Sequence, residues 1–208
     1  MKVRFVTLGC KLNFAESSAL GKELLLRGHQ RASLNEVPDV CVVNTCSVTD
    51  AADHKDRQTI NQLHRKYPNA IIIVTGCYAQ LQPQQIAQIE GVDYVLGQEE
   101  KYSITQLVDE LCDSLEAQRI RVGKIREVEE FHGVHSGDDR TRCFIKVQDG
   151  CNYFCSYCTI PYARGKSRNP WISEVVEDAK KALQGGAKEL ILTGVNIGDF
   201  GRSTGESF

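Results

Sequence analysis

Four near-continuous apolar segments constrain the fold of this chain more than any other feature. They are KVRFVTL (2–8), PDVCVVNT (38–45), AIIIVTG (70–76) and VDYVLG (92–97). Runs of this length and composition are typical of strands that are buried on both faces, as in a parallel sheet. Helical segments are expected between and after them, at 13–28, 50–67, 83–91 and 103–118, the last opening with the capping-box spacing of Ser103 and Gln106. The alternation predicts an α/β fold that begins with a doubly wound parallel sheet domain.

The regular alternation ends near Arg119, which predicts a domain boundary. Residues 119–141 are charged, with scattered glycines, and we interpret them as a connector that contains one or two short strands. The expected domains are therefore 1–118, the connector 119–141, and 142–208. The last contains a strand (143–148), a helix (172–186, with Ser173 as its N-cap), a strand (187–194) and a glycine-rich tail. Because one βαβ unit cannot bury its own faces, we expect the chain to be a fragment of a longer protein.

The nine cysteines are a high and odd number for 208 residues. The sequence shows no signal peptide and no apolar run long enough to cross a bilayer, so we expect a cytoplasmic protein that does not contact a membrane. In that compartment clustered cysteines indicate metal ligands or redox groups rather than disulfides. The formal net charge of −2 excludes a globally basic nucleic-acid surface. Arg164, Lys166 and Arg168 form one local basic strip, for which plain surface charge is the alternative interpretation.

Three cysteines lie just past the ends of predicted strands. Cys10 ends VTLGC, Cys46 ends VVNTC and Cys77 ends VTGC. Because the carboxyl ends of parallel strands meet at one edge of a sheet, we expect these thiols to converge at the edge where such folds bind ligands. The alternative is that they are small buried side chains, a common role of cysteine. We expect that simpler role for the cysteines within predicted strands or helices, which are Cys41, Cys112 and Cys143.

Three further cysteines share one loop, GCNYFCSYCTIPYARGKSRNP, directly after the strand at 143–148. They are Cys151, Cys155 and Cys158. A structural zinc site would need a fourth ligand, and the loop has no histidine; His132 and His135 lie in the connector. An iron–sulfur cube on three cysteines would leave one iron open, which marks a reactive site. The fourth ligand would then be a substrate or a cofactor.

The segment CNYFCSYC resembles the CxxxCxxC loop of the radical S-adenosylmethionine enzymes. The resemblance implies that S-adenosylmethionine chelates the open iron through its amino and carboxylate groups. It also implies a partial βα barrel of which this chain holds the first βαβ part. Tyr157 matches the aromatic residue near the adenine, and LTGVNIG places Gly194, Val195 and Asn196 at the backbone site for the methionine amino group.

Three spread cysteines ahead of such a loop resemble the methylthiotransferases of that superfamily. The resemblance implies two [4Fe-4S] clusters, one on Cys151, Cys155 and Cys158 and an auxiliary one on Cys10, Cys46 and Cys77. NTCSVTDAADHKDRQ and IPYARGKSRN are most similar to the branch that modifies threonylcarbamoyladenosine in tRNA. The resemblance covers essentially the whole chain.

The resemblance also implies the chemistry. The loop cluster gives one electron to S-adenosylmethionine, a 5′-deoxyadenosyl radical takes the hydrogen from C2 of the adenine ring, and the auxiliary cluster presents a methylated sulfur. Arg164 and Arg168 would contact the cofactor carboxylate or an RNA phosphate. The implied partners are an electron donor protein and tRNA, the latter held mainly by a C-terminal domain that this sequence lacks. We therefore expect the 208 residues to bind clusters but not to complete turnover.

Two other interpretations remain open from the residues. One is methylthiolation of an aspartate in a ribosomal protein, which uses the same two cysteine sets. The other is a non-catalytic electron-transfer or metal-binding module, with zinc as a variant. A simple ferredoxin would use four cysteines per cluster, so two sets of three favour open irons and chemistry.

Overall fold

The computed structural model describes residues 1–47, 49–113, 119–137 and 141–207. Contacts between residues divide the chain into two compact units. The first consists of Met1–Gly9 and Leu20–Ile125, and the second of Cys10–Ala19 and Arg126–Phe208. One of the boundaries, between Ala19 and Leu20, falls within a helix, α1 (Lys11–Leu26). The domain ranges expected from the sequence stay a prediction.

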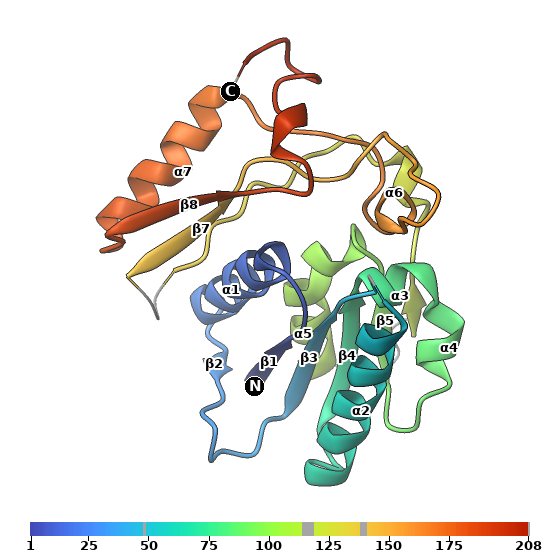
Figure 1. Ribbon diagram of the computed structural model, residues 1–208. Helices are drawn as coiled ribbons and strands as arrows, with labels where there is room; N and C mark the ends of the chain where they lie inside the picture. The colour runs from blue at the N-terminus through green and yellow to red at the C-terminus, as the bar shows by residue number, and fades with distance from the viewer. Residues whose placement is uncertain (48, 114–118, 138–140, 208) are drawn as a thin grey trace. The chain divides into compact units, whose positions relative to one another are not determined.

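The first unit is built on a parallel sheet, which has six strands in the described residues and the order β2-β1-β3-β4-β5-β6 (Figure 1). Because β1 lies between β2 and β3, the sheet grows first to one side and then to the other, which makes it doubly wound as the sequence predicted. The strands are β1 (Lys2–Thr7), β2 (Gln30–Arg31), β3 (Val40–Thr45), β4 (Ile71–Gly76), β5 (Tyr94–Leu96) and β6 (Ile120–Arg121).

Helices cover both faces of this sheet (Figure 1). On one face Cys41 and Val43 of β3 enter a core with α2, α3 and α4. On the other face Val40 and Val42 enter a core with the second half of α1 and with α5. Successive residues of one strand thus enter different cores, which explains the unbroken apolar runs. The helical elements after α1 are α2 (Asp50–Lys66), α3 (Cys77–Leu81), α4 (Pro83–Ala87), the 3₁₀ turn η1 (Glu100–Ser103), α5 (Ile104–Asp113) and the 3₁₀ turn η2 (Ile125–Glu127).

Some local features of the first unit differ from what the sequence predicted. The strand β2 was missed because it has only two residues and both are polar, whereas β6 is a short strand of the kind expected in the connector. Ser103 does not form a capping box with Gln106, because its hydroxyl donates to the Glu100 carbonyl oxygen (2.7 Å) inside η1. The backbone already turns in η1 before α5 begins, so Ser103 is not in the extended conformation of an N-cap.

The second unit contains a parallel pair of strands, β7 (Arg142–Lys146) and β8 (Glu189–Thr193), and α7 (Ile172–Gln184) packs on it (Figure 1). Cys143 and Ile145 of β7 contribute to its core. The unit also contains α6 (Ile160–Arg164), the 3₁₀ turn η3 (Ile197–Asp199) and the first part of α1. Ser173 is not the N-cap of α7, since the helix begins at Ile172 and the Glu174 carboxylate accepts from the Trp171 amide (2.8 Å).

Candidate metal centres

Cys46 and Cys77 leave neighbouring strands at the same level of the sheet. Each directly follows the last residue of its strand, and those last residues, Thr45 and Gly76, are register partners in the β3–β4 pair. Both cysteines therefore lie at the carboxyl edge, where parallel α/β sheets bind ligands. Cys10 follows β1 by three positions but is the first residue of the second unit. Its convergence with the other two stays a prediction.

The Cys77 sulfur accepts a hydrogen bond from a side chain that the sequence analysis did not find. Gln98 Nε2 donates to Cys77 Sγ across 3.2 Å. Lys101 Nζ donates to Gln98 Oε1, and because an ammonium group can only donate, it fixes which end of the Gln98 amide faces the sulfur. Both side chains are buried. The sequence did contain a signal for Gln98, because this residue follows β5 at the same edge of the sheet as Cys46 and Cys77.

The backbone on either side of these cysteines is closely packed. The Cys46 amide donates to the Asp56 carboxylate of α2 (3.0 Å), and burial raises the pKa of Asp56 to about 7. Gly76, which precedes Cys77, has a φ of +99°, and a Cβ there would lie 2.3 Å from the Thr45 carbonyl oxygen. Only glycine fits this position without displacing β3. The two strand ends are thereby held at a fixed spacing.

The second set of cysteines lies on a loop that is closed at its base by backbone hydrogen bonds. Asp149 and Arg168 pair in both directions at 2.9 Å, and the Cys151 amide donates to the Gly165 carbonyl oxygen at 3.0 Å. Gly150 has a φ of +71°, and a Cβ there would lie 1.9 Å from the Lys166 carbonyl oxygen. The cysteine loop, defined here as residues 150–167, therefore depends on glycine where its two ends meet.

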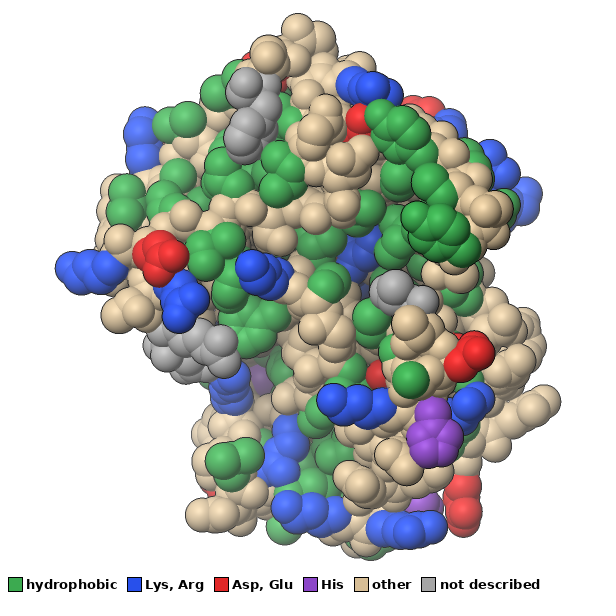
Figure 2. Space-filling view, viewed as in Figure 1, with side chains coloured by type: hydrophobic (Ala, Val, Ile, Leu, Met, Phe, Trp, Pro, Cys, Tyr) green, Lys and Arg blue, Asp and Glu red, His purple; other side chains and the backbone are tan. Residues whose placement is uncertain are grey.

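The thiols of the cysteine loop are accessible. Cys155 is exposed, and Cys151 and Cys158 are half-buried. The Cys158 amide donates to the Cys155 carbonyl oxygen (2.9 Å), which curls the loop between them. Hydrophobic side chains lie at the surface of the second unit (Figure 2), and the loop contributes exposed aromatic residues. Tyr157, expected near an adenine, is 89% exposed.

Gln148 connects the end of β8 with the base of the cysteine loop. Its Oε1 accepts from the Asn196 amide (2.7 Å), and its Nε2 donates to the Gly150 carbonyl oxygen (2.7 Å). A Cβ on Gly194 would lie 3.0 Å from the Gln148 side chain. The structure thus brings Gly194, Val195 and Asn196 beside the cysteine loop. Their role in binding the methionine amino group stays a prediction.

Arg164 and Arg168 are buried, so the interpretation of both as plain surface charge is wrong. Arg164 is 2% exposed and Arg168 is 8% exposed. Arg164 donates to the carboxylates of Glu16 (3.1 Å) and Asp149 (3.0 Å). Arg168 donates to the backbone carbonyl oxygens of Glu130 (2.9 Å) and Arg164 (2.7 Å). The basic strip of the sequence is therefore largely internal, and a contact of either guanidinium with the cofactor or an RNA phosphate stays a prediction.

Comparison with known proteins identifies two families along the chain. "Uncharacterized protein family UPF0004" matches residues 2–97, and "Radical SAM superfamily" matches residues 145–201. The "Threonylcarbamoyladenosine tRNA methylthiotransferase MtaB" of Aquifex aeolicus (strain VF5) is 39% identical over 208 residues, which are 99% of this chain and 50% of the relative. The protein of the same name in Bacillus subtilis (strain 168) is 40% identical over 205 residues, 96% of this chain and 44% of the relative. The "Ribosomal protein uS12 methylthiotransferase RimO" of Chloroflexus aurantiacus is 31% identical over 220 residues, 99% of this chain and 48% of the relative.

The chain belongs to the radical S-adenosylmethionine methylthiotransferases. Membership of this family implies the use of iron–sulfur chemistry and S-adenosylmethionine. The chain spans about half the length of the curated relatives it matches.

The donor groups of this methylthiotransferase chain suit an iron–sulfur cluster. Cys151, Cys155 and Cys158 offer three accessible thiols on one loop, and thiolates are the ligands of such clusters. The N–H donor from Gln98 to the Cys77 sulfur is of the kind that surrounds cluster ligands and adjusts their potential. Among the described residues, no helix is both long enough and apolar enough to cross a membrane.

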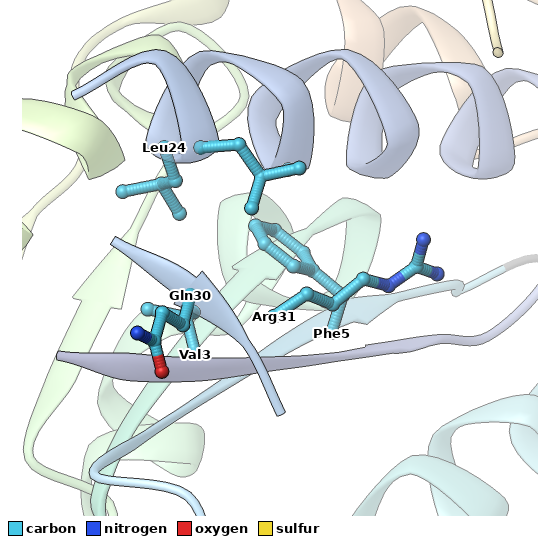
Figure 3. A pocket seen from close by; sticks show the side chains of 7 residues that line it. Val3, Phe5, Leu24, Gln30 and Arg31 are labelled. Atoms are coloured by element: carbon cyan, nitrogen blue, oxygen red, sulfur yellow. The ribbon is translucent and has the colours of Figure 1, made fainter. Parts of the chain in front are cut away.

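Two pockets elsewhere in the described residues are separate from the cysteine sites. In the first unit, α1 and the strands β1 and β2 border a cavity of about 10 Å³ (Figure 3), which is room for about one water molecule. Its lining is Val3, Phe5, Gly21, Leu24, Leu25, Gln30 and Arg31. In the second unit, a pocket of about 210 Å³ is lined by Ile172, Val175, Phe200 and Ser207. Neither contains a cysteine.

Proposed function

We propose that the protein containing this chain adds a methylthio group to C2 of N6-threonylcarbamoyladenosine, next to the anticodon of tRNA. The proposed substrate rests on the sequence identities of the relatives. Five proteins named for threonylcarbamoyladenosine tRNA are 33–40% identical to the chain, and the protein named for ribosomal protein uS12 is 31% identical. Two relatives named for dimethylallyladenosine in tRNA are 26–28% identical.

We propose two [4Fe-4S] clusters, one on Cys10, Cys46 and Cys77 and one on Cys151, Cys155 and Cys158. The bound clusters and S-adenosylmethionine would supply the radical and the sulfur. The chain's own contribution is to bind and orient. The sheet edge holds Cys46 and Cys77, the closed cysteine loop presents the second set, and Gln148 keeps the Gly194–Asn196 backbone beside that loop.

The remaining partners are also proposals. An electron donor protein would reduce the cluster of the cysteine loop, and the exposure of Cys155 supports access from outside. We expect tRNA to be held mainly by parts of the protein beyond these 208 residues, because the formal net charge of the chain is −2 and Arg164 and Arg168 are internal. The expected location is the cytoplasm.

A substrate comparison tests the function directly. The full-length protein, reconstituted without oxygen, is given tRNA that carries threonylcarbamoyladenosine, tRNA that carries dimethylallyladenosine, or ribosomal protein uS12. Mass spectrometry of the nucleosides and the peptide should show a methylthio group on the first substrate alone. A product on the ribosomal protein in place of tRNA would assign the chain to the other branch.

Counting iron tests the clusters separately from the substrate. Two [4Fe-4S] clusters give about eight irons per chain, and replacing Cys151, Cys155 and Cys158 together by alanine should leave about four. The Cys143→Ala variant is the matched control, since Cys143 lies buried in β7 and should keep all of the iron. Bound zinc without iron would favour the metal-binding module.

A further inference from the structure

A chain of hydrogen bonds runs from Cys10 to the base of the cysteine loop. The Cys10 thiol lies 3.8 Å from Asn13 Oδ1, and the same oxygen accepts from Arg164 Nη2 at 2.6 Å. Arg164 Nη1 donates to Asp149 Oδ1 at 3.0 Å. That carboxylate oxygen also accepts the Gly150 amide at 2.9 Å, one residue before Cys151. All of these residues belong to the second unit.

The centre of this chain is a buried group of charges. Two carboxylates, Glu16 and Asp149, face the cations Lys146, Arg164 and Arg168, and each of the five side chains is at most 10% exposed. Lys146 lies 3.5 Å from Glu16 and 3.4 Å from Asp149. Removing charges from water is costly, and apolar side chains of similar volume often give equal stability. A buried ionic group is therefore better explained by the geometry that it fixes than by stability.

The geometry fixed here is the first turn of α1. The Cys10 carbonyl oxygen accepts the Phe14 amide (3.2 Å), so Cys10 opens the helix. Asn13 and Glu16 lie three and six positions after Cys10 and are both fully buried. The ring of Phe14 also packs edge-on against Phe144 of β7, with 5.8 Å between centroids. Cys10 is thus held through the helix start that follows it, whether its sulfur is a thiol or a metal ligand.

Arginine is the residue type that this connection requires. The planar guanidinium of Arg164 reaches Asn13 with one terminal nitrogen and both carboxylates with the other. A lysine has the same charge but a single nitrogen on a flexible stem, so it cannot hold these acceptors in a fixed mutual arrangement.

We propose that Arg164 is a positioning residue that holds Cys10 at a set place relative to the cysteine loop. This inference rests on the proposed function, in which Cys10 and Cys151 are ligands of different clusters. The buried connection then fixes the separation between the radical source and the sulfur to be transferred. A misplacement on the order of 1 Å between reacting groups can cost about 100-fold in rate.

The test compares radical formation with product formation. In the full-length enzyme, Arg164→Lys should keep its iron and continue to release 5′-deoxyadenosine, while the methylthiolated nucleoside formed per 5′-deoxyadenosine falls about 10-fold or more. The magnetic interaction between the two reduced clusters, measured by electron paramagnetic resonance, should weaken or broaden. Arg142→Lys is the matched control, because Arg142 pairs with Glu189 on the surface with its side chain 61% exposed, and both readouts should stay as in the wild type.

A second variant guards against simple misfolding. Asn13→Ala removes the link between Cys10 and Arg164 but leaves the pairs of Arg164 with Glu16 and Asp149, and it should change both readouts in the same direction. An unchanged product ratio and magnetic interaction in both variants would overturn the proposal, as would a parallel loss of iron and of both products. If the wild type formed no methylthiolated tRNA, the proposed function would fail, and the magnetic comparison would still decide the role of Arg164.

Discussion

The two sets of three cysteines are supported in different ways. Cys46 and Cys77 follow strands of a sheet whose residues are buried on both faces, and Cys77 is 3% exposed. The second set lies on a single loop with Cys155 exposed, and the loop is closed by a short antiparallel bridge between Asp149 and Arg168. The positions of Cys46 and Cys77 should therefore resist local change and be lost only when the first unit unfolds, whereas the second set can be lost by a local defect.

Among the substitutions that test this difference between the two sets, Gly76→Ala is expected to have the largest effect. The new Cβ would lie 2.3 Å from the backbone oxygen of Thr45 at a φ of +99°. Strain of this kind costs about 3 kcal/mol, and displacement of a central strand adds to it. Urea unfolding of the cluster-free protein, followed by circular dichroism, measures the loss. Gly28→Ala is the control, with a φ of +87° and no atom within 4 Å, and it should cost about 1 kcal/mol. Equal losses in the two variants would contradict the close packing at Gly76.

Gly150→Ala should damage the second site and spare the first. Its Cβ would lie 1.9 Å from the Lys166 carbonyl oxygen, so the two ends of the cysteine loop would separate. We expect reconstituted iron to fall from about eight to about four per chain. Urea unfolding of the first unit should change little. Gly186→Ala has a positive φ of 94° without close neighbours and should keep its iron. Loss of all iron from Gly150→Ala would show that the two sites are not independent.

Gln98→Leu should change the potential of the first site without emptying it. The substitution removes the hydrogen bond from Gln98 Nε2 to the Cys77 sulfur. That hydrogen bond stabilises the reduced cluster, which is the more negative one, so its loss should lower the reduction potential. A net hydrogen bond of about 1 kcal/mol corresponds to a fall of about 40 mV in a one-electron potential. Redox titration followed by electron paramagnetic resonance gives the value. Gln106→Leu, which removes an exposed bond to Glu110, serves as the control, and an equal shift there would refute the assignment to Gln98.

A further prediction concerns a cysteine outside both sets. Burial raises the pKa of Cys41 to about 11. At pH 8 about one molecule in a thousand carries the thiolate, which is the reactive form. In the cluster-free protein, iodoacetamide should therefore modify the exposed Cys155 at least about 100-fold faster than Cys41. Mass spectrometry of the peptides reads both rates, and comparable labelling of the two would show that β3 is not closed to solvent.

The features that sequence could predict are those that depend on neighbours along the chain. The unbroken runs of Val and Ile revealed strands buried on both faces, and they placed Cys46 and Cys77 at strand ends. Partners from distant segments could not be predicted. Arg164 pairs with Asp149, 15 positions away, and with Glu16, 148 positions away. The local run of basic residues therefore indicated an exposed strip where the structure has a buried ionic group.

The composition of the second unit from residues 10–19 and 126–208 has a consequence for biosynthesis. A ribosome adds about 5–20 residues per second. With 148 positions between Glu16 and Arg164, the helix start would leave the ribosome on the order of 10 s before its buried partner has been made. Until then Asn13 and Glu16 have only solvent or chaperones to contact in place of Arg164. Residues that are synthesised among the first acquire their final neighbours among the last.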